Sequence, residues 1–277
     1  MTLNRVIGNE QSVISGALNA NGQVFIINSA GVLFTKDSQV NVGGFVASTL
    51  DISNKNFMAG NYVFSGSSSA SVVNMGTIHA ADGGYVALLG QTVSNQGVIT
   101  ATLGTVAMAS GNKITLNFNG DSLVDVTIDE GTLNALVENK GAIKADGGRV
   151  VLTAKAADAV LSAQVNNSGV IQAQTMAALK GGSGASGTAH VGSIKLLASG
   201  ETVKVAGKLD ASEPKGGNGG KIETSGNRVT IAEDAVITTK SASGENGTWL
   251  IDPVNFTIAA GGDIMGAQLG NRWPMAM

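Results

Sequence analysis

The sequence predicts an all-β fold, a right-handed parallel β-helix whose short strands wind into a solenoid with brief hairpin or loop excursions. A unit of the form Asn-x-Gly-x-Ile-x-Ala recurs at Asn74, Asn95, Asn139 and Asn167. Apolar residues alternate with polar or small ones within these units, which is the β-strand pattern. The 277 residues include 39 Gly and 3 Pro, with 4% aromatic and 13% charged residues. This composition favours many tight turns around a core of small aliphatic side chains.

The first element predicted in detail is a strand, a turn and a second strand within residues 19–34. Val24–Ile27 is a β-branched and aromatic run, and Val32–Phe34 is a second one. The preceding pair Asn21-Gly22 can take a positive φ at little cost. Between the runs, Asn28–Gly31 predicts a turn in which the Asn28 side chain accepts a backbone N–H two or three residues on and Gly31 supplies a positive φ.

This stretch resembles the secretion-domain signature of the filamentous haemagglutinin family, the exoproteins of two-partner secretion. That pattern is close to N-x-N-G-x-[VI]-[FY]-[LI]-I-N-P-N-G-[VI]-x-F. The matching residues are Asn19, Asn21, Gly22, Val24, Phe25, Ile27, Asn28, Gly31, Val32 and Phe34. Ser29 and Ala30 replace the usual Pro-Asn. Gly44–Asn54 and Gly247–Ile258 also resemble stretches of the family, so the resemblance covers most of the chain.

The resemblance implies a non-catalytic exoprotein that an outer-membrane transporter partner exports and that attaches to a cell-surface receptor or glycan. It implies a protein secreted by a Gram-negative bacterium or held on its surface. The residues expected to form the secretion-motif turn are Asn19, Asn21, Gly22, Asn28, Gly31 and Phe34. Growth-inhibition and haem-acquisition exoproteins share this module and remain alternatives. The first twenty residues lack the apolar core of a signal peptide. The resemblance therefore implies that the signal peptide and the first strands of the secretion domain are missing, so we expect an interior fragment or a gene product with a truncated start.

The resemblance and the repeats together predict three segments. Residues 1–177 are expected to be an incomplete secretion domain, 178–270 to continue the β-helix, and 271–277 to be an off-pattern tail. Two Gly-rich stretches, 181–187 and 215–220, predict loops between coils.

The spacing of the repeats predicts the size of a coil. A second unit, Gly-x-[Val/Ile]-x-[Leu/Met], begins at Gly84, Gly104, Gly148 and Gly192, with steps of 104−84 = 20, 148−104 = 44 and 192−148 = 44. We therefore expect coils of about 20–22 residues, with some steps skipping a coil and roughly a dozen coils in all.

Stacked coils place like residues above like residues, so the repeats also predict two ladders. Ile78, Ile99, Ile143 and Ile171 are expected to form one internal ladder. The four Asn residues that open the repeats are expected to form a second ladder, joined through their amides. Helix propensity marks 131–137 and 154–165 as the possible exceptions to the β pattern.

The alternative from another class is a polysaccharide lyase or hydrolase, since such enzymes also use β-helices. Asp121, Asp125, Asp129 and Glu130 form the densest acidic group, but no Lys or Arg lies between them to act as a base. We expect these carboxylates to lie exposed on a loop or hairpin.

The remaining motifs do not support a cofactor or nucleic acid. Gly182-x-Gly184-x-x-Gly187 is followed by a strand-like stretch where a dinucleotide fingerprint opens a helix. Lys221 stands where a calcium nonapeptide has Asp. The chain has no Cys, and its net charge of −3 gives no footprint for nucleic acid.

Overall fold

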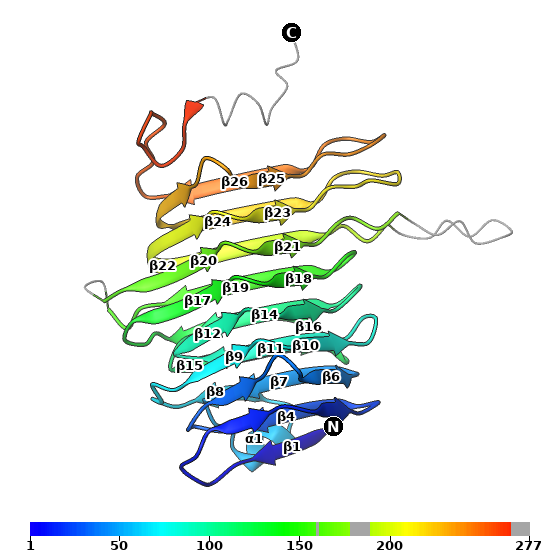
Figure 1. Ribbon diagram of the computed structural model, residues 1–277, viewed down its shortest axis with the longest axis vertical. Helices are drawn as coiled ribbons and strands as arrows, with labels where there is room; N and C mark the ends of the chain where they lie inside the picture. Colours follow the sequence, from blue (N-terminus) through cyan, green and yellow to red (C-terminus); the bar gives the residue numbers. More distant parts are fainter. Residues whose placement is uncertain (159–160, 178–188, 267–277) are drawn as a thin grey trace, which may run out of the picture.

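A computed structural model describes residues 1–158, 161–177 and 189–266, and these form a parallel β-helix with three columns of strands (Figure 1). The strands of the first column are β1 (Thr2–Arg5), β4 (Gln23–Ile27), β7 (Gly44–Ser48), β11 (Tyr85–Gly90), β14 (Thr105–Ser110), β19 (Arg149–Lys155), the first part of β22 (Ser193–Val205), the first part of β24 (Lys221–Ile231) and β26 (Thr248–Pro253).

The other two columns complete each coil. The strands of the second column are β2 (Ser12–Ile14), β5 (Val32–Phe34), β9 (Ser71–Asn74), β12 (Thr92–Asn95), β17 (Ala135–Asn139), β20 (Ala163–Asn167) and the later parts of β22 and β24. The strands of the third are β3 (Ala17–Asn19), β6 (Gln39–Val42), β10 (Thr77–Ala80), β13 (Val98–Thr100), β18 (Ala142–Lys144), β21 (Val170–Gln172), β23 (Lys208–Asp210) and β25 (Val236–Thr238).

Four elements lie outside the coils and form a covering layer. They are the short helix α1 (Asn54–Met58) and the antiparallel strands β8 (Tyr62–Ser65), β15 (Lys113–Asn119) and β16 (Ser122–Glu130). α1 and β8 are inserted between β7 and β9, while β15 and β16 form a hairpin inserted between β14 and β17. The layer is thus built from two coils and forms its own sheet, in the order β16-β15-β8.

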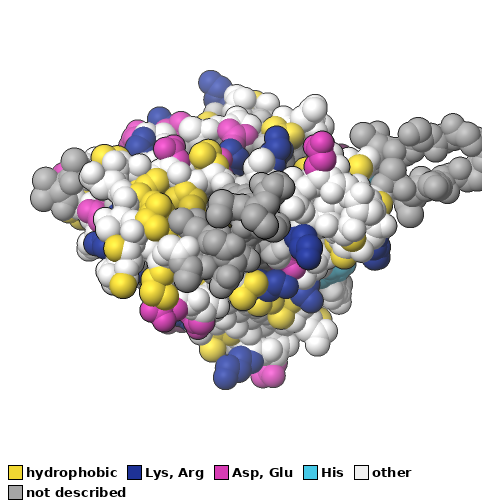
Figure 2. Space-filling view, turned by 90° about the horizontal axis from the view of Figure 1, so that it is seen from above, with side chains coloured by type: hydrophobic (Ala, Val, Ile, Leu, Met, Phe, Trp, Pro, Cys, Tyr) yellow, Lys and Arg dark blue, Asp and Glu magenta, His cyan; other side chains and the backbone are white. Residues whose placement is uncertain are grey.

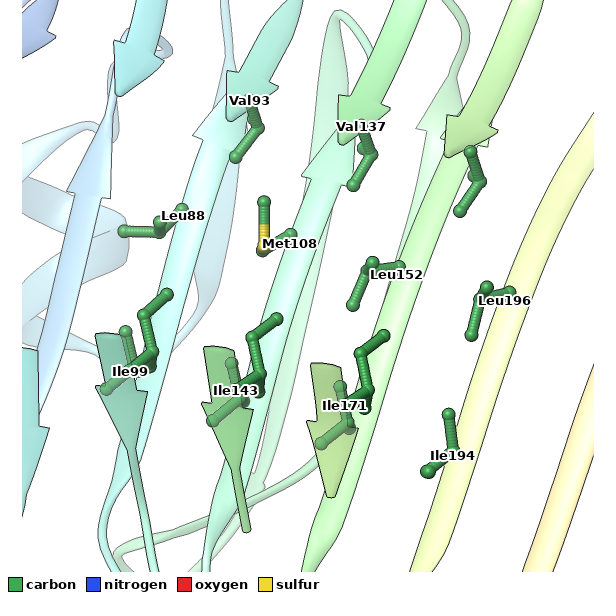
Figure 3. Packing of buried hydrophobic residues seen from close by; sticks show 14 of the residues in the cluster. Leu88, Val93, Ile99, Met108, Val137, Ile143, Leu152, Ile171, Ile194 and Leu196 are labelled. Carbon is green, nitrogen blue, oxygen red and sulfur yellow. The ribbon is translucent and has the colours of Figure 1, made fainter. Parts of the chain in front are cut away.

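The predicted Ile ladder is confirmed. Ile78 pairs in register with Ile99, Ile99 with Ile143 and Ile143 with Ile171, and all four side chains are fully buried. Figure 3 shows Ile99, Ile143 and Ile171 one after another in this ladder. The ladder continues beyond these repeats through Val40 on one side and Leu209 on the other. A one-residue slip of any coil would turn these side chains outward, so the ladder fixes the register.

The predicted Asn ladder is also confirmed. The Nδ2 of Asn74 donates to the Oδ1 of Asn95, Asn95 donates to Asn139, and Asn139 donates to Asn167, each at 2.8 Å. All four residues are at most 1% exposed. Phe34 precedes Asn74 in this row and Val205 follows Asn167, so apolar side chains close both ends of the polar row. Each buried amide is therefore satisfied without water.

The prediction that some steps skip a coil is wrong. β14 pairs directly with β19, and β19 pairs directly with β22, so Gly104, Gly148 and Gly192 mark consecutive coils. The first step of 44 residues contains the β15–β16 hairpin, and the second contains the stretch of chain between Met176 and His190, which form an isolated bridge. The extra residues in these steps belong to insertions and not to additional coils. The first column therefore has nine strands in the described residues, fewer than the dozen predicted.

Neither of the two possible helices forms in the described residues, and parts of both are strands. Strand β17 begins at Ala135 within the first candidate, and β19 and β20 occupy the two ends of the second. Residues 215–220 form a loop as predicted. Residues 181–187 and 271–277 lie outside the described residues. The pairing of β19 with β22 continues one sheet past residue 177, and the domain boundary there stays a prediction.

Residues 254–266 cross the end of the stack beyond β24. The backbone N–H of Ile231 donates to the carbonyl of Asp263 at 2.8 Å, and Ile264 is only 1% exposed over the core. Arg228 pairs with the Asp263 carboxylate at 2.6 Å. Figure 2 looks onto this end and shows charged side chains of both signs scattered among hydrophobic ones. No helix in the described residues has the length and apolar character that crossing a membrane requires.

Candidate secretion-motif site

The turn at Asn28–Gly31 joins β4 to β5 and is held by the side chain of Asn28. This side chain is fully buried, and its Oδ1 accepts the backbone N–H of Ala30 at 2.9 Å. The N–H of Gly31 donates to the Asn28 carbonyl at 3.0 Å. These two bonds close the turn that the sequence predicts. Ser29 and Ala30 therefore leave the turn intact where the signature has Pro-Asn.

Gly31 has a φ of 107°, the positive value expected for it. A Cβ there would lie 3.2 Å from the carbonyl oxygen of Ser71 and 3.1 Å from Nε2 of Gln11. Both the backbone conformation and the surrounding space therefore favour glycine. A β-branched residue at this position would be strained by its φ and crowded by the neighbouring coils.

The same turn connects three successive coils. The Nδ2 of Asn28 donates to the carbonyl of Glu10 at 3.0 Å and to the hydroxyl of Ser12 at 2.8 Å, both in the preceding coil. On the other side, the Ser68 hydroxyl donates to the carbonyl of Ser29 at 2.5 Å. Asn28 thus uses both ends of its amide, one for its own turn and one for its neighbour, so removing it would leave several buried groups unpaired.

The other three residues of the motif lie at a different corner of the coil, where Asn19 ends β3 and Asn21 and Gly22 lead into β4. Asn19 and Asn21 are exposed, and the Oδ1 of Asn19 accepts the Asn41 amide at 2.9 Å on the outer face. Asn21 and Gly22 form a bend without positive φ. The close approach at this corner falls on Gly43, where a Cβ would lie 2.9 Å from the Asn21 carbonyl. The structure therefore separates the six residues into two groups.

Phe34 belongs to the interior. Its ring is fully buried, 5.6 Å from the ring of Phe45 in an edge-to-face arrangement. Phe34 lies three residues after Gly31, so the conformation of the turn determines where its ring enters the core. Burial of this size and an aromatic pair make Phe34 an anchor for β5.

The covering layer lies on the outer face of β4, β7, β11 and β14, which begins beside the turn (Figure 1). Phe25 contacts Phe57 of α1 at 5.3 Å and Tyr62 of β8 at 5.7 Å between ring centroids. Tyr62 and Tyr85 contact Phe118 of β15 at 4.8 and 4.9 Å. This second core buries the outer faces of β4, β7, β11 and β14, so the strand leading into the turn is held from inside and outside.

Tyr85 is the polar residue within this second core. Its hydroxyl donates to Oε1 of Gln23 at 3.2 Å, and Nε2 of Gln23 donates to Asp121 at 3.1 Å. Burial raises the pKa of Tyr85 well above its ordinary value, and the nearby Tyr62 and Asp121 raise it further. The phenol therefore stays neutral and serves as a hydrogen-bond donor.

The N-terminal strand is fastened to the same region by Arg5. Its Nε donates to Asp51 at 2.7 Å, its Nη1 donates to Asn54 at 2.9 Å, and its Nη2 contacts the carbonyl of Ile52. Because three groups before and at the start of α1 share one guanidinium, β1 and the covering layer are held together by a planar, multidentate contact.

The acidic group lies on the β15–β16 hairpin, as predicted. Asp121, Asp125 and Asp129 are exposed. Asp121 accepts a hydrogen bond from Gln23, while Asp129 accepts one from Thr115 at 2.6 Å, so these carboxylates serve different contacts. Within the described residues, no three His, Cys, Asp or Glu side chains are grouped to hold a metal. The arrangement gives no support to lyase or glycosidase chemistry.

Sequence reasoning did not find the covering layer, although two signals for it are present. Residues 113–119 alternate apolar and polar side chains and precede Gly120-Asp121, a hairpin signal. Tyr85–Gly90 is apolar at nearly every position, as expected of a strand buried on both faces. Together, these patterns point to a hairpin packed on the outside of a coil.

A family profile described as the TPS secretion domain matches residues 1–224, most of the chain. The chain belongs to the TPS secretion domain family. Two-partner secretion exoproteins are exported by Gram-negative bacteria with an outer-membrane transporter as partner, so the domain implies such a partner. The match spans the turn, the covering layer and the first strands beyond residue 177.

Solved and curated relatives agree with this assignment. The crystal structure of the HMW1 secretion domain from Haemophilus influenzae is 32% identical, with a TM-score of 0.68 over 90% of this chain and 61% of that one.

Two proteins named heme/hemopexin-binding protein are similar. One, from H. influenzae strain KW20 Rd, is 34% identical over 166 residues, which are 55% of this chain and 17% of that protein. The other, from H. influenzae, is 30% identical over 194 residues, which are 61% of this chain and 20% of that protein. The chain thus spans about a fifth of these relatives, which are named as binding proteins and not as enzymes.

Proposed function

We propose that this chain is the secretion module of an exoprotein that serves, without catalysis, in attachment to a cell or surface. The partner in export is the outer-membrane transporter, and the partner in attachment is a receptor or glycan on a host or neighbouring cell. The match to the TPS secretion domain over residues 1–224 carries the export half of this proposal. The attachment half rests on the resemblance to filamentous haemagglutinin. The protein is then secreted or held on the cell surface.

Within this module, the turn at Asn28–Gly31 is the element on which export depends. The supporting observation is that the Asn28 amide reaches Glu10 and Ser12 in the preceding coil while it closes its own turn. A chain that emerges and folds coil by coil needs such a contact to dock each new coil on the previous one. The exposed residues Asn19 and Asn21 are the second part of the motif and present side chains to the transporter.

The test places the chain behind a signal peptide and co-expresses it with a two-partner secretion transporter. We expect Asn28→Ala with Gly31→Val to lower the amount of protein in the medium at least severalfold. Gly60→Val is the matched control, because Gly60 also has a positive φ, 73°, but its Cβ would meet nothing within 4 Å. It introduces a β-branched residue at a positive φ away from the turn, and secretion should remain near the level of the unchanged chain.

Thermal unfolding of both purified variants separates folding from export. Secretion of the double variant at the level of the unchanged chain would refute the role of the turn. Equal losses of secretion and of stability in both variants would also refute it, since general destabilisation would then be sufficient.

A second candidate function is haem acquisition, which the names of the two curated relatives favour. Titration of the purified chain with haem, followed by its absorbance spectrum, tests whether this portion binds the group. A saturable spectral shift at a 1:1 ratio would favour haem acquisition over attachment. The growth-inhibition alternative shares the same module and would be decided by residues other than these.

We also propose that the secretion domain occupies residues 1–177 and that 178–270 continue the coil stack. Limited proteolysis of the purified chain tests this division. Cleavage between 178 and 188 that leaves a stable fragment ending near 177 supports the boundary. Cleavage that begins elsewhere and leaves no such fragment contradicts it.

A further inference from the structure

A groove of about 200 Å³ opens where the covering layer ends, between the β15–β16 hairpin and the corner of the coils. Gly104 and Gly148 line it from the coils, and Ser122 and Val124 line it from β16. Leu103 and Arg149 complete it. The volume corresponds to roughly seven water molecules, which suits a ligand of about nine non-hydrogen atoms. None of the residues that line the groove belongs to the secretion motif.

Leu103 is the unusual residue of the groove. It has a φ of 57°, whereas the equivalent positions of the adjacent coils are Gly83 and Gly147, with φ of 77° and 68°. The equivalence rests on the hydrogen bonds of their N–H groups, each to a carbonyl of the next coil. A leucine in this conformation is strained by on the order of 1 kcal/mol or more, while glycine is not. The turn itself therefore does not require a leucine.

The Leu103 side chain lies across the corner and forms an apolar wall. One of its methyl groups, Cδ2, is 2.6 Å from the place where a Cβ of Gly147 would be, so it occupies the space that this glycine leaves. The side chain is 36% exposed, and Val124 and Val191, which also line the groove, are 38% and 49% exposed. Three apolar side chains thus face the same small opening.

Arg149 supplies the charge. Its Nη1 contacts the carbonyl of Val124, which fixes the guanidinium at the groove, and no acidic side chain of the described residues forms an ion pair with it. Further N–H donors of the planar guanidinium remain for an anion. Ser193 pairs in register with Arg149, and Lys221 follows in the next coil, so a hydroxyl and a second cation continue the outer face.

We propose that this groove binds a small organic carboxylate that carries an apolar ring or chain. The carboxylate pairs with the Arg149 guanidinium, whose fork matches it in shape and charge. The apolar part lies against Leu103 and Val124. Ser122 and Ser193 donate hydroxyls at the rim. Leu103 is accordingly a specificity-determining residue, kept despite its backbone strain for its contact with the ligand.

The test uses the full chain and cyclohexanecarboxylate as the probe, with ligand-observed NMR and calorimetry as readouts. We expect saturable binding with a Kd on the order of 1 mM, as suits a ligand of about nine non-hydrogen atoms. Acetate lacks the apolar part, and cyclohexanecarboxamide lacks the charge, so each should bind at least about tenfold more weakly.

Three variants locate the probe. Arg149→Gln should weaken binding about tenfold or more, while Lys204→Gln, which removes an exposed cation from the second column, should leave it unchanged. Leu103→Gly should also weaken binding, and because glycine relieves the strained φ it should not lower the melting temperature. That combination separates a ligand contact from a structural role.

Absence of saturable binding by the probe at tens of millimolar would overturn the proposal. Binding that survives Arg149→Gln unchanged would overturn it as well, because the ligand would then lie elsewhere. A Leu103→Gly variant that loses stability but binds normally would show that the leucine serves the fold alone.

Discussion

The outward face of the first column differs between its two halves. Under the covering layer, its ladder consists of Phe25, Val46, Ala87 and Ala107, all fully buried. Val151, which is still buried, follows Ala107 in this ladder. The ladder then continues as Lys195, Glu223 and Leu250, which are exposed or half-buried. The inward ladder that begins at Val24 and Phe45 remains apolar through Val86, Val106, Val150, Ile194 and Ile222. The coil geometry is the same in both halves, so the residues facing outward are determined by what covers them.

The two halves share surface ion pairs but differ in what is added to them. Lys195 pairs with Glu223 at 2.8 Å in the uncovered half, and Arg5 pairs with Asp51 at 2.7 Å in the covered half. The covered half also has aromatic contacts and the buried hydroxyl of Tyr85. Exposed ion pairs contribute little to stability, whereas buried aromatic area contributes much. The covered half should therefore be the more sensitive to substitution.

The largest effect should come from the interior that both halves share. Ile143→Asp places an unpaired charge in a ladder that is fully buried, at a cost of about 4 kcal/mol or more. Urea denaturation should show a chain largely unfolded before denaturant is added. An Ile143→Asp variant with an unfolding midpoint near that of the unchanged chain would contradict the conclusion that water is excluded from this ladder.

The next effect distinguishes the halves directly. Phe64→Ala removes a fully buried ring from the covering layer and should lower the free energy of unfolding by about 3–5 kcal/mol. Leu250→Ala changes the outward ladder of the uncovered half, where the side chain is 53% exposed, and should change it by no more than about 0.5 kcal/mol. Similar losses for the two variants would mean that the layer contributes no second core.

A smaller effect is expected at Gly44, under the ring of Tyr85. A Cβ there would lie 2.6 Å from the ring, so Gly44→Ala should cost about 1–3 kcal/mol through overpacking. Ser193→Ala, in the same row of the uncovered half, should be nearly neutral. Thermal unfolding compares them, and a neutral Gly44→Ala would show that the ring moves aside freely.

The smallest effect concerns pH and the uncovered half. Burial of Asp210 opposes its charge, but hydrogen bonds from Lys208 and Ser212 outweigh it and lower its pKa below the ordinary value. The resulting stability is present above the unfolded pKa, about 3.9, and is lost as pH falls through the lower folded pKa. The melting temperature should fall slightly less between pH 5 and 2 in Asp210→Asn than in the unchanged chain. An equal fall in melting temperature for the two chains over this pH range would show that Asp210 does not contribute to the loss of stability in acid.

The repeating parts of the fold could be predicted from sequence, and the inserted parts could not. The register of Ile78, Ile99, Ile143 and Ile171 followed from the repeat alone, because stacked coils put equivalent positions in contact. Insertions obey no period, so a step of 44 residues looked like a skipped coil when it contained a hairpin. The β20 segment had helical propensity, but pairing with its neighbours in the stack overrode it.

The candidate site divides in the same way. The hydrogen bond from Ala30 to Asn28 and the positive φ of Gly31 arise from local turn chemistry, which the sequence states directly. The bonds from Asn28 to Glu10 and Ser12 depend on which coil lies below, and no local pattern contains that information. The strained φ of Leu103 was equally hidden, since the sequence there shows a leucine where the neighbouring repeats have glycine.

The direction of the inter-coil hydrogen bonds has a mechanical consequence. These bonds lie along the long axis of the stack, so tension applied between its two ends loads them in line (Figure 1). Coils at a free end then peel away one after another, and each coil of about 20 residues releases roughly 70 Å of extended chain. The covering layer joins the coils from β4 to β14 across their outer face, so these resist peeling longer than those from β22 to β26. Under tension, the coils at the uncovered end should therefore unfold one at a time and lengthen the chain in steps, while the coils at the covered end stay folded.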